Sequence, residues 1–368
     1  MTPPRIRYVD LAAHNAPLRE KLLAAVDRVL THGNFILGPE VAQLEKALAS
    51  FLDVPHVVGV SNGTDALVLG LKLLGVKAGD EVICPSHSFV ATATSIRLLG
   101  AVPVMVDIDE RTMNIDPAAV KAALTSKTKA VMPVHLSGMP AQVEALAELC
   151  KSAGISMLED CAQSIGTKSA GRSVGSLGVG CFSLHPLKIL SALGDAGFIT
   201  VQTEAQVTEL KRMRNIGLVD RDHCDSVDSN MRLDTIHASM LLAKLPHVSE
   251  WIAARRAHAA AYREALKGLV ELPAEEGNGF HVYSAFVIRH PQRDALAAFL
   301  AERGIEAKIH YPIPIHRQKA FADLKHGPLP VTERVCSTIL SLPVTPELTA
   351  AHRTEVIDGI REFTATKR

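Results

Sequence analysis

The sequence predicts an α/β protein with a mostly parallel, seven-stranded sheet between helices and a smaller C-terminal α+β part. Three observations lead to this prediction. From residue 56 to 159, short apolar runs alternate with helical patterns of 10–15 residues, which is typical of βαβ units. Helical patterns dominate from about 204 to 269, and strands and helices mix beyond that point. The chain of 368 residues is also too long for one usual core, so we expect two domains, 1–247 and 248–368.

Each element follows from its own pattern. Two helices are predicted before the alternation, at 16–32, ending before Gly33, and at about 39–52. The strands of the sheet are expected at 56–60, 81–84, 102–108, 130–136, 155–159, 181–184 and 197–201. Helices between them are expected at 63–74, 89–99, 117–124 and 142–153. The C-terminal part should contain helices at 251–269, 293–303 and about 349–364, and strands at 281–289 and 306–311.

Composition excludes several functional classes. Lys and Arg together number 39, as do Asp and Glu, so no overall field favours nucleic acid or an anionic membrane. The amino terminus has no apolar signal core, and no apolar run approaches the ~20 residues that span a bilayer. The six cysteines are dispersed, without a CxxC pair, which favours a reduced, cytoplasmic setting.

Lys188 is the first candidate for chemistry. It closely follows the apolar run 181–184, beside His185 and Pro186. Five neighbours in the sequence are apolar, namely Phe182, Leu184, Leu187, Ile189 and Leu190. Partial desolvation would lower the pKa of the amine and leave it neutral, as a nucleophile toward an aldehyde must be. The alternative is a lysine at a strand edge with its ammonium group in water.

Two carboxylates, Glu159 and Asp160, end the apolar run that begins at Ile155. A parallel strand delivers such residues to the carboxyl edge of its sheet, where α/β proteins bind ligands. Adjacent strand residues point to opposite faces, so only one of the two can face a ligand. The alternative for Asp160 is an ordinary helix N-cap.

These stretches resemble the pyridoxal-phosphate (PLP) sugar aminotransferases of the DegT/DnrJ/EryC1/StrS family. The resemblance rests on motifs that occur in the family's order over nearly the whole chain. They are SNGTDAL at 61–67, SFVATA at 88–93, PVHLSG at 133–138, EDCAQ at 159–163, CFSLHPLK at 181–188, ALGDAG at 192–197, SNMRLDTIHAS at 229–239 and HYPIPIH at 310–316. It implies the aspartate-aminotransferase-like fold, known as fold type I, and PLP as cofactor.

The resemblance also implies a role for each matching residue. Lys188 would bond to the aldehyde of PLP and then act as the base that moves a proton between carbons. Asp160, rather than Glu159, would keep the pyridine nitrogen protonated. The remaining cofactor contacts would come from Gly63, Thr64 and Ser183 at the phosphate, Phe89 on the ring face, Gln163 at the phenolic oxygen and Asn230 at the phosphate of a second subunit. The last contact implies a homodimer with shared active sites.

Substrate contacts are expected from the loop at 310–317, which the resemblance places over the pocket. The candidates for sugar hydroxyls or a nucleotide phosphate are His185, His310, Tyr311, His316 and Arg317. Two histidines so close suggest a metal, but no third ligand is near in the sequence, so we expect none. No GxGxxG follows a predicted strand, which argues against a nucleotide-dependent oxidoreductase.

The sequence departs from the family pattern at three positions. Ala196 stands where glycine is usual, and alanine does not freely adopt positive φ. Ile189 replaces a common asparagine, and His237 replaces a usual glutamine. None of these changes removes a predicted catalytic role.

The function predicted on this basis is transfer of an amino group, with glutamate as the expected donor, to a nucleotide-linked keto-sugar in amino-sugar biosynthesis. The turn at 192–197 resembles members that act at C-3 of a 3-keto-6-deoxyhexose. One alternative is a PLP-dependent dehydratase, although such relatives carry histidine in place of Lys188. The other is a PLP or sugar-nucleotide sensor without catalysis, although no separate DNA-binding domain or basic tail is visible.

Overall fold

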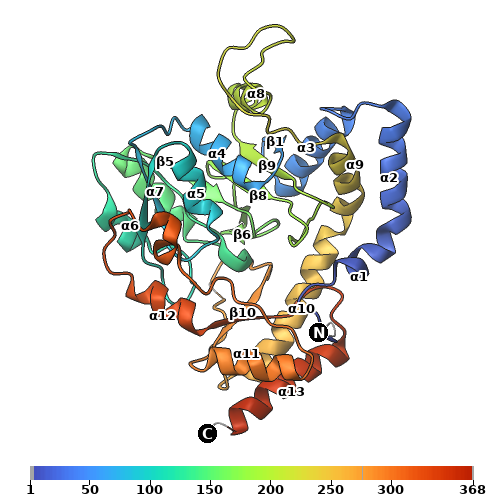
Figure 1. Cartoon of the computed structure of the whole chain (residues 1–368), viewed down its shortest axis with the longest axis vertical. Helices are drawn as coiled ribbons and strands as arrows, with labels where there is room; N and C mark the ends of the chain where they lie inside the picture. The colour runs from blue at the N-terminus through green and yellow to red at the C-terminus, as the bar shows by residue number, and fades with distance from the viewer. Residues whose placement is uncertain (1–3, 276, 367–368) are drawn as a thin grey trace.

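The computed structural model describes residues 4–275 and 277–366 (Figure 1). Its centre is a seven-stranded sheet in the order β1-β9-β8-β5-β4-β2-β3. The strands are β1 His56–Val60, β2 Glu81–Pro85, β3 Val102–Val106, β4 Thr128–Val131, β5 Ser156–Asp160, β8 Val179–Ser183 and β9 Gly197–Val201. Only β9 runs antiparallel to its neighbours, β8 and β1, so the mostly parallel sheet is confirmed.

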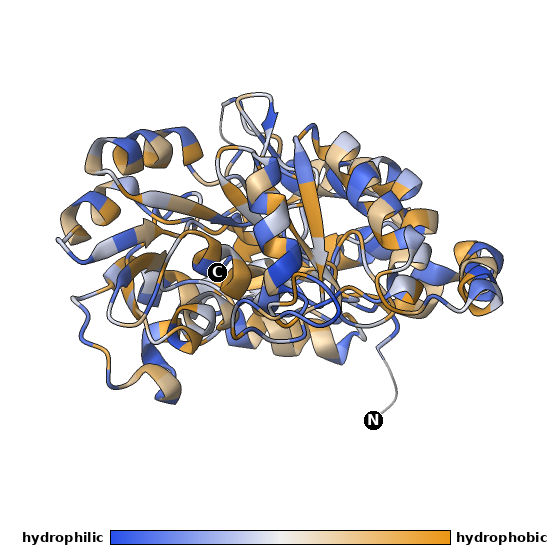
Figure 2. Ribbon diagram, turned by 90° about the horizontal axis from the view of Figure 1, so that it is seen from above, coloured by the Kyte–Doolittle hydropathy of each residue, from blue (hydrophilic) through white to orange (hydrophobic). Residues whose placement is uncertain are grey.

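Helices cover both faces of this sheet, because alternate strand residues are apolar on each face. Phe182 and Phe198 belong to the core on one face, and Cys181 and Ile199 to the core on the other. The first face is covered by α2 Arg19–His32, α3 Pro39–Leu52, α6 Pro117–Ala123, α7 Val143–Ala153 and α9 Thr235–Lys244. The second is covered by α4 Gly63–Leu73, α5 Ala91–Leu98 and α8 Glu204–Met213. Figure 2 shows these apolar stripes as orange segments on otherwise mixed helices.

The C-terminal part lies below the sheet in Figure 1 and has its own core. Its elements are α10 Val248–Leu266, β10 Phe286–Arg289, α11 Arg293–Glu302, α12 Pro330–Thr338, β11 Ile339–Leu342 and α13 Ala350–Thr366. Ile6 belongs to the same core, and its backbone pairs with Gly304 and Glu306. We propose a domain boundary between residues 247 and 248, with the segment around Ile6 packed on the smaller domain.

Several predicted elements differ from the structure. The strand predicted at 281–289 shortens to β10, because the chain turns at Tyr283, where φ is 51°. The strand predicted at 306–311 is reduced to one bridge, between Lys308 and Ser341. Two elements were missed, α12 and β11. The carboxylate of Asp107 accepts hydrogen bonds from the first turn of α12, a signal too distant in sequence to be read locally.

Three short elements were also not predicted, namely α1 Leu11–Asn15 and the hairpin strands β6 Lys168–Ser169 and β7 Arg172–Ser173. Among the described residues, none of the helices combines the length and apolar character that a membrane crossing requires.

Candidate active site

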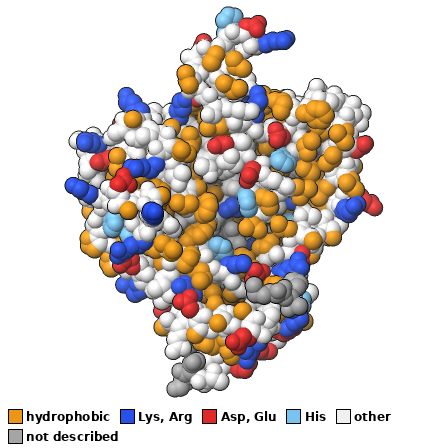
Figure 3. Space-filling view, viewed as in Figure 1, with side chains coloured by type: hydrophobic (Ala, Val, Ile, Leu, Met, Phe, Trp, Pro, Cys, Tyr) orange, Lys and Arg blue, Asp and Glu red, His pale blue; other side chains and the backbone are white. Residues whose placement is uncertain are grey.

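The carboxyl edge of the sheet brings the two main candidates together. Asp160 ends β5, and the neighbouring parallel strand β8 ends at Ser183, shortly before Lys188. Lys188 and Asp160 lie close enough for the charge of each to affect the pKa of the other. Figure 3 shows a hollow in the middle of the molecule, with basic side chains and histidines along it. The predicted pairing of these two residues therefore has a structural basis.

Lys188 lies in a turn fixed by backbone hydrogen bonds. Its own N–H donates to the carbonyl of His185 at 2.8 Å, and the N–H of Ala192 donates to the carbonyl of Leu184 at 2.7 Å. The predicted apolar neighbours are buried except Leu187, which is 56% exposed instead. Burial lowers the pKa of the Lys188 amine to about 8, while the charge on Asp160 opposes this shift. A useful fraction of the amine is therefore neutral near physiological pH.

Asp160 and Glu159 point to opposite faces, as strand alternation predicts. Asp160 accepts hydrogen bonds from the N–H of Ala162 at 3.1 Å and from the hydroxyl of Thr92 at 2.9 Å. Burial raises the pKa of Asp160, and these hydrogen bonds and the Lys188 charge oppose the rise. Glu159 instead takes part in a buried pair with His135 at 3.1 Å. Only Asp160 faces the side of Lys188.

One group of metal-ligand types occurs among the described residues, formed by His135, Glu159 and Cys161, whose donor atoms lie within 4.8 Å of one another. Hydrogen bonds within the protein already use the ring of His135 and the carboxylate of Glu159. His135 accepts at Nδ1 from the N–H of Ala141, and Glu159 accepts from the N–H of Gly175 at 2.9 Å. The group therefore serves to fasten the strand that carries Asp160.

The start of α4 offers donors for an anion. Asn62 caps this helix by accepting from the N–H of Asp65 at 2.8 Å, and Gly63 and Thr64 follow as its first two residues. Among the described residues, the N–H groups of Gly63 and Thr64 have no hydrogen-bond acceptor. A Cβ on Gly63 would lie 2.6 Å from the Cβ of Ser183, so only glycine allows this approach. The first turn of α4, with its two N–H groups, thus lies directly against Ser183.

A flat ring has a partner in Phe89, which is 52% exposed. Its ring centre lies 5.6 Å from that of Tyr311. The hydroxyl of Tyr311 accepts from the Gln163 amide at 3.2 Å, and Gln163 accepts from the N–H of Ser137 at 2.8 Å. The structure therefore joins Phe89, Gln163 and Tyr311 from three distant motifs.

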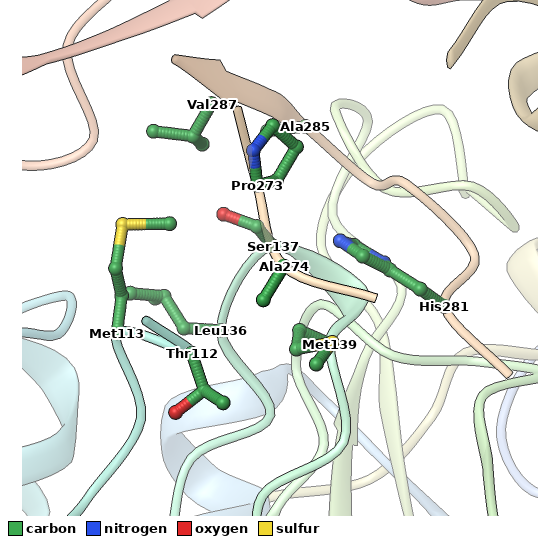
Figure 4. Close-up of a pocket in the computed structure, with 10 residues that line it drawn as sticks. All are labelled: Thr112, Met113, Leu136, Ser137, Met139, Pro273, Ala274, His281, Ala285 and Val287. Carbon is green, nitrogen blue, oxygen red and sulfur yellow. The ribbon is translucent and has the colours of Figure 1, made fainter. Parts of the chain in front are cut away.

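Behind Ser137 lies a cavity of about 10 Å³, close to the space that one water needs. Figure 4 shows it between Met113, Ser137, His281 and Val287, with the Ser137 hydroxyl toward its centre. That hydroxyl is buried and has no hydrogen-bond partner within the part of the chain that the structure describes. Neither Lys188 nor Gln163 lines this cavity, so it is not the reactive cleft.

The loop at 310–317 divides into two environments. His310 bonds at Nδ1 to the hydroxyl of Ser341 at 2.9 Å, and burial, with the nearby Lys188 charge, lowers its pKa to about 4. His316 is buried instead, with Nδ1 2.7 Å from the Ser86 hydroxyl. His316 and Arg317 both bond to Glu333, at 3.2 and 2.9 Å. These contacts attach the loop to the residue after β2 and to α12, and a substrate contact by either residue stays a prediction.

His185 and Asn230 are both exposed. Partial burial and the charge of Lys188 lower the pKa of His185, and its Nδ1 accepts from the N–H of Leu187 at 3.2 Å. Asn230 lies next to Met231, whose carbonyl accepts from the N–H of Ser61 at the end of β1. Within a single chain, both side chains are therefore accessible to a ligand or to a second subunit.

The three departures from the family pattern are accommodated. Ala196 is buried and is not among the described residues with positive φ, so the turn needs no glycine there. Ile189 joins the core below Lys188. His237 packs against Gly194, where a Cβ would lie 3.0 Å from its ring. The turn after Lys188 is thus packed against the core through Ile189 and against α9 through His237.

Three neighbours of the site were missed from the sequence. Thr92 bonds to Asp160, and Ser88 bonds to Thr92 at 2.8 Å. Ser88 lies in the bend before α5 and Thr92 in its first turn, so their contact depends on the geometry of the helix start and had no periodic signal. Tyr8, whose ring lies 5.5 Å from that of His310, had no such signal either, because its place depends on how the amino terminus packs.

These features define the class of protein. A lysine of lowered pKa, a buried carboxylate opposite it, free N–H groups at a glycine-opened helix and an exposed aromatic ring fit the aldehyde, ring nitrogen, phosphate and ring face of PLP. The donor set and the space at Gly63 suit that cofactor, so the fold and site are those of a PLP-dependent enzyme.

Comparison with known proteins gives the family. The model of the DegT/DnrJ/EryC1/StrS aminotransferase family matches residues 17–361. The chain is 41% identical to the UDP-N-acetyl-3-dehydro-alpha-D-glucosamine 3-aminotransferase of Acidithiobacillus ferrooxidans, over 93% of this chain and 94% of that protein. It is 38% identical to the dTDP-3-amino-3,4,6-trideoxy-alpha-D-glucose transaminase of Streptomyces venezuelae, over 98% and 96%. It is also 41% identical to a "pleiotropic regulatory protein" of Geobacillus stearothermophilus, over 97% and 98%.

Solved structures agree. DesV of S. venezuelae superposes with a TM-score of 0.96 at 37% identity, covering 99% of each chain. NtdA of Bacillus subtilis, solved with the cofactor PMP, superposes with a TM-score of 0.90 at 28% identity, covering 99% of this chain and 86% of that one. The chain belongs to the DegT/DnrJ/EryC1/StrS aminotransferase family, and it is a PLP-dependent aminotransferase.

Proposed function

We propose that this protein transfers the amino group of glutamate to the C-3 carbonyl of a nucleotide-linked 3-keto hexose. Glutamate becomes 2-oxoglutarate, and the sugar carbonyl becomes an amine. The observation that carries the proposal is Lys188, with a pKa of about 8, facing the buried Asp160. Two of the relatives quoted above, those of Acidithiobacillus and Streptomyces, are named for 3-dehydro or 3-amino sugars on UDP or dTDP, which supports both C-3 and a nucleotide carrier. Since only some of them are named for deoxy sugars, a 6-deoxy ring is one of two substrate forms to test.

Each residue then has a defined part. PLP, when bound, supplies a ring that accepts electrons from the reacting carbon. Lys188 would hold the cofactor through its aldehyde, and its Nζ would be placed to move the proton at the reacting carbon. Asp160 would keep the ring nitrogen protonated. The remaining roles are proposed from the family resemblance: Gly63, Thr64 and Ser183 would bind the phosphate, Phe89 would stack on the ring, and Gln163 would contact the ring oxygen. The proposed contacts to the sugar nucleotide are His185, His310, Tyr311, His316 and Arg317.

The glutamate half of the reaction gives a direct test. The PLP-loaded protein should be yellow, and glutamate alone should bleach that colour as the amino group passes to the cofactor. Addition of a UDP- or dTDP-linked 3-keto hexose should restore the colour and give a sugar in which NH₂ and hydrogen replace the keto oxygen. Mass spectrometry reads the product. A deoxygenated sugar would favour a dehydratase, and an unchanged colour with glutamate would reject this donor.

A second candidate is regulation without catalysis, favoured by one observation, the name of the Geobacillus relative. The two candidates make opposite predictions for turnover. A protein that binds PLP and a sugar nucleotide but forms no amino sugar with glutamate would support the regulatory candidate. The complete Lys188 and Asp160 arrangement supports catalysis.

We also propose a homodimer in a cytoplasmic setting. Asn230 is exposed, as it must be to reach a second subunit, and the turn around Lys188 exposes two leucines, Leu187 and Leu193, at 56% and 52%. Large apolar side chains exposed next to a reactive turn support a surface that a second copy covers. All six cysteines are free, and five are buried, which supports the reducing compartment.

Leu193→Glu is expected to convert the dimer into monomers and to weaken PLP binding, because a charge would be buried between the subunits. Light scattering after gel filtration measures the mass. Leu98→Glu is the matched control, since Leu98 is 65% exposed on α5, in the opposite helix layer, and should keep the dimer. A monomeric wild-type protein would contradict the proposal.

A further inference from the structure

We propose that Thr92, backed by Ser88, is a positioning residue that keeps the carboxylate of Asp160 ionised and aimed at the pyridine nitrogen of PLP. The inference rests on the proposed function of this site and adds residues for which the predicted cofactor contacts provide no role. Both side chains are buried, Thr92 with 1% and Ser88 with 4% of its surface exposed.

The geometry shows a directed chain of hydroxyl groups. Thr92 is in the first turn of α5 and donates its hydroxyl proton to Oδ2 of Asp160 at 2.9 Å. Because that proton is committed, the Ser88 hydroxyl, 2.8 Å away, is the donor to Thr92. The N–H of Ala162 donates to the other oxygen, Oδ1, at 3.1 Å. Each oxygen of the buried carboxylate thus has one donor from the protein.

The same helix supplies an internal contrast. A threonine in a helix usually donates its hydroxyl to the carbonyl four residues earlier. Thr94 does so, with its hydroxyl 2.9 Å from the carbonyl of Val90. Thr92, two residues earlier on the same helix, donates its hydroxyl proton to Asp160 instead. The two threonine hydroxyls on this helix therefore have different acceptors, and only Thr92 donates to a residue of the site.

The carboxylate needs this donor because burial opposes its charge. Lys188 and His135 face it as groups whose positive charge favours ionisation. The other titratable groups around it are the phenol of Tyr311 and the thiols of Cys84, Cys161 and Cys181, all of which its charge makes harder to ionise. Without the Thr92 hydroxyl, Asp160 would bind a proton more readily, and a neutral acid does not hold the pyridine nitrogen in its protonated form.

The test is Thr92→Val, which keeps the β-branched shape and removes the hydroxyl. PLP affinity is measured by equilibrium dialysis, and the absorbance of bound PLP is titrated with pH. Loss of one hydrogen bond to a buried charge should weaken PLP binding about ten- to hundredfold and move the spectral titration relative to wild type. Thr92→Ser, which restores the hydroxyl, should return both readouts close to wild type.

Thr94→Val is the matched control and should leave both readouts unchanged. Ser88→Ala should give a smaller loss than Thr92→Val, because the Thr92 hydroxyl remains but is no longer oriented; this variant carries the test if Thr92→Val does not fold. A Thr92→Val protein with wild-type PLP affinity and spectral titration would overturn the inference. So would a Thr92→Ser protein whose PLP affinity is as low as that of Thr92→Val. Wild-type protein that binds no PLP would refute the proposed function instead.

Discussion

Lys188→Ala is expected to lower the rate of amino transfer by at least about 10⁴-fold, because one side chain serves both as the covalent attachment point and as the base. The protein should bind PLP without the yellow colour of the lysine-bound form. Lys121→Ala, which changes an exposed lysine on α6, is the control and should retain both colour and rate. Methylamine added to Lys188→Ala should restore part of the rate, since it can occupy the vacated space as a free base.

The same substitution should also change how the free energy of unfolding depends on pH. The pKa of Lys188 is about 8 in the folded protein and about 10.5 as a free side chain, so between these values the unfolded chain binds more protons. The free energy of unfolding of cofactor-free protein should therefore rise with pH over this window, by up to about 3 kcal/mol from Lys188. Urea unfolding of wild type and Lys188→Ala measures the difference in slope. Lys244, also at about 8, contributes equally to both proteins. A colourless Lys188→Ala with wild-type activity would contradict the assignment of this lysine.

Asp160→Asn is expected to lower the rate by about 10³-fold, because an amide keeps the size of the side chain but cannot neutralise a protonated ring nitrogen. PLP should also dissociate more readily. In cofactor-free protein the same substitution should stabilise the fold. Burial raises the pKa of Asp160, so the folded protein holds this proton more tightly than the unfolded chain does. The free energy of unfolding therefore falls as pH rises from the pKa of a free aspartate to that of Asp160. Near pH 7 the asparagine variant should therefore unfold at a higher temperature than wild type.

Glu159→Gln is the matched control, one residue away on the opposite face of β5. It should lower the melting temperature, because Glu159 is paired with His135 and accepts the N–H of Gly175 in the core. The folded variant should still bind PLP as wild type does. If Glu159→Gln lost PLP and Asp160→Asn kept it, the assignment of the two carboxylates would be reversed.

Local pattern was sufficient for the parts of this site that a single strand or turn determines. Alternation along β5 predicted that only one of Glu159 and Asp160 could face a ligand, and the structure places them on opposite sides. The apolar run before Lys188 predicted desolvation of its amine. It did not predict that Leu187 points to solvent, because a turn has no fixed period.

Contacts between segments that are distant in the sequence could not be predicted from local patterns. His316 was predicted as a substrate ligand beside His310. The structure adds that its ring is buried and bonds to Ser86, directly after β2, and to Glu333 in α12, while the substrate contact stays a prediction. The start of α12 depends on Asp107, more than 200 positions earlier. Such partners are set by packing of the whole chain, so neither spacing nor propensity around residue 316 or 330 could identify them.

The pairing of Ile6 with Gly304 and Glu306 has a consequence for how the polypeptide is made. The N–H of Tyr8 also donates to Glu306, 298 positions further along. The elements of the central sheet all precede α10, whereas the core that contains Ile6 also needs α11 and α13, which follow much later in the sequence. Residues around Ile6 are therefore made long before their packing partners, and we expect them to stay unpaired until α11 and α13 have folded.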